Sequence, residues 1–309
     1  LEKAAGPFVN GIYAGDPTRL PTRHAFPNLY RCEQESGSIF KGMRAAQKQA
    51  KKATSHRLRK REIISFRQGM GVLPEAIAAL LEDDSIFTKV KIGGISYIKK
   101  TKRWHMDWKC GKSMGQGSFS DIIITTPAHK LEDIPLERDV LDAVSKVPHL
   151  DYPPVSAMLL GFKREQITHP LDGFGMLNAL NEKSKMLGAL FSSTLFEGRA
   201  PEGHVSINVM LGGARTPEHA KMTDSAMKAS VMDELRILLG IEGNPTFSNV
   251  VRWEKAIPQL NLGYSSVLEQ IERCELKYQG IHFAGNYRGG ISVGDCILAG
   301  IQLTKKISR

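Results

Sequence analysis

The stretch at 281–300 constrains the fold of this chain more than any other. Its sequence, IHFAGNYRGGISVGDCILAG, starts with apolar residues that favour a strand and continues into a helix-forming run. Glycines between the two allow positive φ angles and a close approach of the backbone to a ligand. The first N–H groups of a helix have no partner inside it and stabilise a negative group placed there. The pattern therefore predicts a strand–turn–helix unit, either as a ligand site or as a turn without a ligand.

The other predicted elements indicate a mixed fold. Strands are predicted by FTKVKI, ISYIKK, RWHMDWK, DIIITTP, VSAMLLGFK, GFGMLN, MLGALFSS, HVSINVMLGG, FSNVVRW and GIHFAG. Helices are predicted at 18–55, 72–81, 217–239, 265–274 and 291–306. Gly93–Gly94 should separate the first two strands, and 111–118 should form a Gly/Ser loop. The strands after residue 150 suggest an antiparallel sheet, so the fold class we expect is α/β in the mixed α+β sense.

Composition excludes several classes of protein. With 41% hydrophobic and 24% charged residues in 309, the chain is neither disordered nor a disulfide miniprotein. Its apolar runs are far shorter than the roughly 20 residues of a membrane-spanning helix. The four cysteines form no CxxC pair and the nine histidines form no HxxxH pair, so we expect reduced thiols and no metal site.

Positive charge is concentrated in residues 41–67. Ten basic residues against Glu62 alone give this segment +9 of the chain's net +10. Three interpretations compete: a solvated helix face, a surface for anionic lipid, and a nucleic-acid surface. The segment lacks interleaved aromatic residues and matches no nucleic-acid module, so we expect no nucleic-acid partner. The basic residues are Lys41, Arg44, Lys48, Lys51, Lys52, Arg57, Arg59, Lys60, Arg61 and Arg67.

Several motifs together resemble one family. AGNYRGGISVGDC is similar to the C-terminal flavin motif of the oxygen-dependent protoporphyrinogen oxidases, within the flavin amine oxidase superfamily. GIYAGDPTRLP, SFRQGMGVLPEAI, GFGMLN, LGALFSSTLFEGRAP and RWEKAIPQL resemble further segments of that family in the same order. Each motif is weak alone, but the collinear set covers essentially the whole chain.

The resemblance implies a site for FAD and a site for a porphyrinogen. The residues implied to lie along FAD are Ile95, Thr126, Trp253, Gly285, Asn286, Gly290, Ile291, Ser292 and Val293. The Val293 backbone would lie near the C2 oxygen of the isoalloxazine, and the Ile95 backbone near the adenine. The residues implied to contact the substrate are Gly11, Val155, Leu177 and Phe191. No catalytic side chain is expected, because the flavin carries the chemistry.

The implied activity is the six-electron oxidation of protoporphyrinogen IX to protoporphyrin IX by O2, with release of H2O2. The expected location is cytoplasmic or organellar, with peripheral membrane contact through 41–67, and a homodimer stays open. A strand–GxGxxG–helix segment should grip the FAD diphosphate in this fold, and the sequence contains none. We therefore expect a C-terminal fragment of such an enzyme that binds FAD poorly by itself.

The expected architecture is two interleaved domains. One is an incomplete FAD-binding domain at 61–130 and 255–309. The other is a substrate domain with a helical part at 1–60 and a sheet part at 131–254. Three alternatives stay open: a coproporphyrinogen III oxidase, another flavin amine oxidase or desaturase, and a non-catalytic tetrapyrrole-binding fragment.

Overall fold

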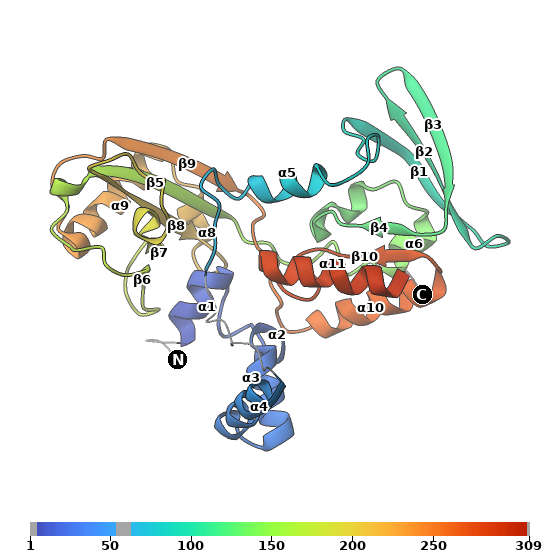
Figure 1. Cartoon of the computed structure of the whole chain (residues 1–309), viewed down its shortest axis with the longest axis horizontal. Helices are drawn as coiled ribbons and strands as arrows, with labels where there is room; N and C mark the ends of the chain where they lie inside the picture. Colours follow the sequence, from blue (N-terminus) through green and yellow to red (C-terminus); the bar gives the residue numbers. More distant parts are fainter. Residues whose placement is uncertain (1–4, 54–62, 308–309) are drawn as a thin grey trace. The chain divides into compact units, whose positions relative to one another are not determined.

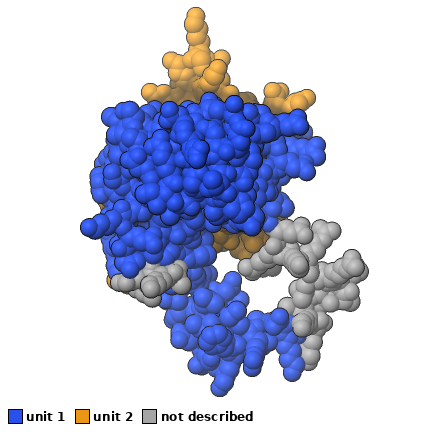
Figure 2. Space-filling view, turned by 90° about the vertical axis from the view of Figure 1, so that its left-hand side faces the viewer, with its two compact units in different colours: residues 1–79, 154–254 blue, residues 80–153, 255–309 orange. Residues whose placement is uncertain are grey.

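The chain forms two compact units, each built from two separate stretches of sequence. The structure is a computed structural model that describes residues 5–53 and 63–307 (Figure 1). Unit 1 comprises 1–79 and 154–254, and unit 2 comprises 80–153 and 255–309 (Figure 2). The units interleave along the sequence, and one boundary lies at 254/255, where the sequence analysis also drew one. Their other boundaries lie at 79/80 and 153/154, whereas the sequence suggested 60/61 and 130/131.

A five-stranded antiparallel sheet forms the centre of unit 1. Its order is β6-β7-β8-β5-β9. The strands are β5 (Val155–Lys163), β6 (Gly175–Leu177), β7 (Met186–Leu190), β8 (His204–Gly212) and β9 (Phe247–Trp253). Short turns η2 (Arg164–Gln166) and α7 (Ser192–Leu195) follow β5 and β7. The antiparallel sheet that the apolar runs after residue 150 predicted is confirmed.

One long helix covers a face of this sheet. Helix α9 (Asp224–Leu239) packs its buried residues, such as Val231 and Leu235, on Met158, Leu160 and other sheet residues. The predicted single helix at 217–239 is wrong in one respect, because α8 (Pro217–Ala220) is separate. Thr223 interrupts the run: its side chain accepts a hydrogen bond from the N–H of Ala226 and so caps α9.

The N-terminal part of unit 1 is helical. It contains α1 (Ala5–Tyr13), α2 (Thr22–Ala25), α3 (Pro27–Ser36), α4 (Ile39–Ala53) and α5 (Val72–Ala78). The continuous helix expected at 18–55 is therefore three helices. Pro27 begins α3, since proline fits the first turn of a helix but breaks its interior, and Gly37 ends it in a left-handed conformation. Helix α1 was not predicted.

An antiparallel three-stranded sheet, β1-β2-β3, begins unit 2. Its strands are β1 (Val90–Ile98), β2 (Arg103–Cys110) and β3 (Ser113–Phe119). Two predictions are wrong here. Gly93–Gly94 does not separate two strands but forms an irregularity within β1, and 111–118 is mostly strand. Gly115 lies directly against the indole of Trp108, so the glycines that suggested a loop instead make room for an aromatic ring.

A small parallel sheet carries the motif singled out in the sequence. Strand β4 (Ile122–Ile124) pairs with β10 (Ile281–Phe283), with Ile124 opposite Phe283. The helical elements of unit 2 are η1 (Ala128–Asp133), α6 (Arg138–Ala143), α10 (Tyr264–Lys277) and α11 (Val293–Ile307). The core of this unit includes Trp104, Val140, Ile271 and Phe283. Mixed helices with parallel and antiparallel sheets confirm the predicted fold class.

Candidate flavin and substrate sites

The glycine-rich turn lies at the carboxyl end of the parallel sheet. Beyond the last paired residues of β10 and β4, the N–H of Ala284 donates to the carbonyl of Ile124 at 2.9 Å. The backbone of Gly285 then has φ +150° and that of Gly290 has φ +138°. Ligands of open α/β sheets bind outside the carboxyl ends of the strands. The turn that the sequence indicated thus stands where this architecture places a ligand.

Helix α11 begins directly after this turn with a polar cap. The hydroxyl of Ser292 accepts a hydrogen bond from the N–H of Asp295 at 3.0 Å and donates to its carboxylate at 2.7 Å. A Cβ on Gly290 would overlap that carboxylate, so only glycine fits there without a shift. Ile291 is half-buried and Val293 is 53% exposed. Backbone N–H groups at a helix start therefore lie beside accessible apolar side chains, which suits a planar ring that carries an electron-rich oxygen.

The structure brings most of the predicted cofactor residues together. Thr126 is exposed just beyond β4, and Thr125 contacts the position that a Cβ on Gly285 would take, at 3.8 Å. Asn286 is half-buried in the turn itself. These residues share one edge of the β4–β10 sheet with Gly290, Ser292 and Val293. That clustering makes them a single candidate site within unit 2.

Two predicted cofactor residues lie elsewhere. Ile95 is buried in β1, where its N–H donates to Pro135 at 2.8 Å and its carbonyl accepts from Glu137 at 3.0 Å. Because both backbone groups of Ile95 already have a partner, an adenine hydrogen-bonded to this backbone would have to donate to the second lone pair of the Ile95 carbonyl oxygen. Trp253 ends β9 of unit 1, opposite Val155, with its side chain 47% exposed.

An apolar groove of about 550 Å³ lies in unit 1, between α1 and strands β6 and β7. It contains two of the predicted substrate residues, Gly11 and Leu177. They are in direct contact, since a Cβ on Gly11 would overlap the Leu177 side chain. The groove is lined by Phe8, Gly11, Ile12, Phe174, Gly175, Met176, Leu177, Gly188, Ala189, Leu190 and Met210. No charged side chain is among these residues.

The other two predicted substrate residues do not line this groove. Phe191 is only 3% exposed and packs in the unit 1 core, with its ring 5.8 Å from that of His169. Val155 is buried at the start of β5. The groove is instead lined by Leu190, the last residue of β7 and the residue before Phe191. Phe8 and Ile12 were also missed, although their spacing of four residues is the signal of one helix face.

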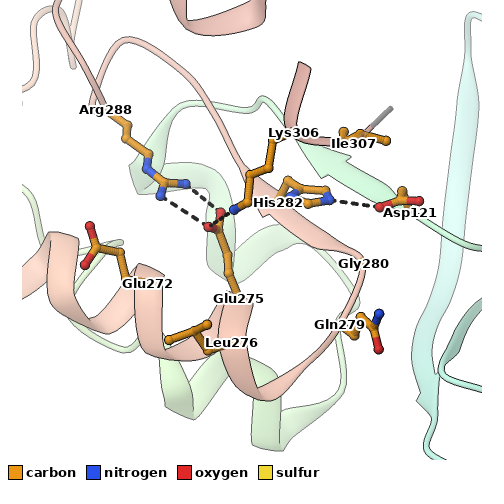
Figure 3. A pocket seen from close by; sticks show the side chains of 10 residues that line it. All are labelled: Asp121, Glu272, Glu275, Leu276, Gln279, Gly280, His282, Arg288, Lys306 and Ile307. Carbon is orange, nitrogen blue, oxygen red and sulfur yellow. Dashed lines mark hydrogen bonds and ion pairs between the residues drawn. The ribbon is translucent and has the colours of Figure 1, made fainter. Parts of the chain in front are cut away.

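A second pocket, of about 830 Å³, is polar and lies in unit 2 (Figure 3). Its central carboxylate belongs to Glu275 of α10, whose side chain is only 6% exposed. Arg288 donates to it at 2.5 and 3.2 Å, and Lys306 at 3.2 Å. Nearby, His282 lies 2.9 Å from the carboxylate of Asp121. Among the described residues that line this pocket, Arg288 and Lys306 both bind the carboxylate of Glu275.

The ion pairs of Glu275 control its protonation. Burial alone would raise the pKa of this carboxyl group, but hydrogen bonds from Arg288 and from the N–H of Phe283 outweigh burial and lower the pKa below its usual 4.5. A carboxyl group with a depressed folded-state pKa stabilises the fold above its unfolded pKa. That contribution is lost as the pH falls through the folded value.

The lowered pKa of Glu275 predicts how the stability of the chain depends on pH. We expect Glu275→Gln to lower the thermal midpoint of the chain near neutral pH, because Arg288 and Lys306 lose their buried counter-charge. As the pH falls below 4.5, the carboxyl group takes up a proton in the unfolded chain before it does so in the folded one, so the difference between the two proteins should shrink. Midpoints measured by circular dichroism between about pH 7 and pH 3 test this. A difference that stays constant over this range would contradict it.

Two further properties concern metals and membranes. Within residues 5–53 and 63–307, no three His, Cys, Asp or Glu side chains gather as a metal site. In the same part of the chain, no helix has the length and apolar character needed to cross a bilayer.

Comparisons with known proteins find similar sequences over nearly the whole chain. The model of the family described as flavin containing amine oxidoreductase matches residues 2–307. The mitochondrial protoporphyrinogen oxidase of Nicotiana tabacum is 33% identical over 95% of this chain and 62% of its own length. The coproporphyrinogen III oxidase of Bacillus subtilis is 23% identical over 96% of this chain and 62% of its own length. The chain thus spans about three fifths of these relatives.

Solved structures show the same fold. A crystal structure of a protein from Exiguobacterium, described only as a candidate protoporphyrinogen oxidase, superimposes with a TM-score of 0.75 at 20% identity. The match covers 99% of this chain and 63% of that one. Reduced UDP-galactopyranose mutase superimposes with a TM-score of 0.60 at 15% identity, over 91% of this chain and 58% of its own.

Proposed function

The chain belongs to the flavin-containing amine oxidoreductase family, and from this premise we propose that it serves the FAD-dependent oxidation of protoporphyrinogen IX to protoporphyrin IX. The observation that carries the proposal is the turn at 284–292. Its positive-φ glycines and the start of α11 suit a flavin ring. The names of similar proteins in tobacco and Arabidopsis suggest the substrate class. By this proposal the chain takes part in porphyrin and haem biosynthesis.

The cofactor is FAD, and the residues of unit 2 fit its isoalloxazine end. Bound FAD would take electrons from the porphyrinogen and pass them to O2, which yields H2O2. We assign Gly285, Asn286 and Gly290 to the close backbone approach, and the N–H of Val293 to the C2 oxygen. Ser292 would hold the cap that fixes the helix start, and Thr126 would border the ring from the end of β4. Ile95 and Trp253 are assigned to the adenine end and to the surroundings of the flavin.

The groove of unit 1 is our proposed position for the tetrapyrrole. Gly11 and Leu177 would contact the ring directly, whereas Phe191 and Val155 would support the groove from the core. The lining is wholly apolar. Burying a carboxylate without a partner is costly, so this lining favours a ring with few acidic substituents.

A coproporphyrinogen III oxidase is the second candidate, because the relative in Bacillus subtilis carries that name. Its substrate bears four carboxylates where protoporphyrinogen IX bears two. The apolar groove and the higher identity to the tobacco relative both favour protoporphyrinogen IX.

The substrate is tested by the oxidation of the two porphyrinogens with added FAD, followed by the fluorescence of the porphyrin product and the H2O2 formed. Protoporphyrinogen IX should be oxidised above its spontaneous rate and in preference to coproporphyrinogen III. The reverse preference would move the assignment to the second candidate. FAD binding without turnover of either would favour a non-catalytic tetrapyrrole-binding protein or another flavin amine oxidase.

Peripheral membrane contact is part of the proposal, and helix α4 supports it. Its side chains combine exposed apolar and basic groups: Phe40 is 80% and Met43 51% exposed, beside exposed Lys41, Arg44 and Lys48. The remaining basic residues, from 51 to 61, have side chains outside the described part of the chain. The relatives in tobacco and Arabidopsis have chloroplastic or mitochondrial names, so we propose an organellar membrane surface. A homodimer stays a proposal without structural support.

Reversing the charge of α4 tests the membrane contact. Each basic residue near an anionic bilayer contributes about 1 kcal/mol. The triple variant Lys41→Glu, Arg44→Glu and Lys48→Glu should therefore reduce flotation with phosphatidylserine vesicles by about tenfold or more. The control makes the same charge change on the exposed lysines Lys91, Lys109 and Lys112 of unit 2. Equal loss in both variants, or none in the first, would contradict a specific role for α4.

A further inference from the structure

Helix α10 holds the glycine-rich turn at two points. At its start, the hydroxyl of Tyr264 donates to the carbonyl of Tyr287 at 2.6 Å. Near its end, Glu275 accepts a hydrogen bond from the N–H of Phe283 at 3.0 Å and binds the guanidinium of Arg288. Phe283 is the last residue of β10, and the two other contacts lie within the turn. One helix therefore fixes the strand end and the middle of the turn at once.

Glu275 also reaches the far end of α11. Lys306 of that helix donates to the second carboxylate oxygen, while Arg288 additionally donates to the carbonyl of Phe283 at 2.8 Å. Figure 3 shows the carboxylate between the two cations. The segment from 283 to 306 is thus tied to one buried acid at its beginning, in its turn and near its end. Lys306 is the residue of α11 that takes part in these ties, and it joins that helix to Glu275 of α10.

We propose that Glu275 and Tyr264 are positioning residues, which hold the turn at 284–292 in the conformation that receives the flavin. Neither side chain is assigned to contact with the cofactor. Each acts through the turn: Glu275 through Arg288 and the end of β10, and Tyr264 through the carbonyl of Tyr287. Both are well suited to this role, since Glu275 is 6% exposed at its side chain and Tyr264 is 5% exposed. The hydrogen bonds between Glu275 and Arg288 join two charged groups, and such bonds are stronger than those between neutral groups.

The test measures the amide exchange of the turn and the affinity for FAD separately, since the inference rests on the proposed flavin site. Glu275→Gln keeps an acceptor for Phe283 but removes the charge that binds Arg288 and Lys306. Glu272→Gln, on the same helix and in the same pocket but exposed, is the matched control. Tyr264→Phe removes only the hydroxyl and serves as a second, milder variant. Amide hydrogen exchange of the purified chain and its FAD dissociation constant are the two measurements.

We expect the amides of 284–292 to exchange about tenfold faster in Glu275→Gln and faster in Tyr264→Phe, with those of β1 and β2 unchanged. The FAD dissociation constant should rise by about tenfold in Glu275→Gln and stay unchanged in Glu272→Gln. Two results would overturn the positioning role. One is faster amide exchange throughout unit 2, and the other is faster exchange at 284–292 with an unaltered FAD dissociation constant. Because the sequence contains no GxGxxG segment, the FAD affinity of the wild-type chain is expected to be weak. A turn at 284–292 that stays unprotected even at saturating FAD would overturn the proposed function, and the inference with it.

Discussion

Gly290→Ala is expected to weaken FAD binding by about fivefold to 150-fold. Two effects act at this position. The backbone has φ +138°, which L side chains rarely adopt, and the new Cβ would overlap the carboxylate of Asp295. Strain of this kind costs about 1–3 kcal/mol. To relieve this strain and overlap, the turn would have to move, or the Asp295 carboxylate would have to leave its hydrogen bond with Ser292. Either change shifts the start of α11. Fluorescence titration with FAD measures the loss.

Gly300→Ala is the matched control in the same helix. Nothing lies within 4 Å of its added Cβ. Alanine is also favoured over glycine inside a helix by about 0.5–1 kcal/mol. This variant should keep the wild-type FAD affinity and melt at the same or a slightly higher temperature. Equal affinity of Gly290→Ala and wild type would show that the turn does not approach FAD closely.

Trp104→Ala is expected to destabilise unit 2 by about 3–5 kcal/mol. The side chain is fully buried, with its ring 5.0 Å from that of Tyr97, and its indole N–H donates to the carbonyl of Gln279 at 3.0 Å. The substitution leaves a cavity and removes the donor to the carbonyl of Gln279. Since a domain is stable by only about 5–15 kcal/mol, unit 2 should unfold well before unit 1.

Differential scanning calorimetry with limited proteolysis would show this as a separate early transition confined to 80–153 and 255–309. Trp253→Ala serves as the comparison, because that side chain is 47% exposed in unit 1 and its removal should cost about 1 kcal/mol or less. A single cooperative transition that shifts as a whole in Trp104→Ala would mean that the two units do not unfold independently.

The elements with a clear hydrophobic period could be predicted from the sequence. Strand β5 contains a continuous apolar run, β8 alternates apolar with polar residues in its first half, and glycines indicate the β10–turn–α11 unit. Strand β3 could not be predicted, because its glycines suggested a loop. Only the packing of Gly115 against Trp108 explains them. The break before α9 was also not predicted. It depends on the cap by Thr223, and the residues on both sides of Thr223 favour a helix.

The candidate sites divide in the same way. The collinear motifs indicated the flavin amine oxidase superfamily, which is confirmed, and they located the turn at 284–292. Of the four predicted substrate residues, two line the groove, namely Gly11 and Leu177. Leu190 at the end of β7 lines the groove, whereas Phe191 just beyond the strand packs in the core, and the sequence alone does not distinguish these two positions. The Glu275 network was missed because an acid on α10 reveals nothing of a partner thirteen residues later.

The most direct test of the account is the location of FAD on the chain. Hydrogen exchange should be measured on the purified protein with and without saturating FAD under anaerobic conditions. The account predicts that FAD slows exchange at 284–294 and at the residues after β4, while exchange in the five-stranded sheet of unit 1 stays the same. Protection confined to other segments, or no protection at the turn despite bound FAD, would contradict it.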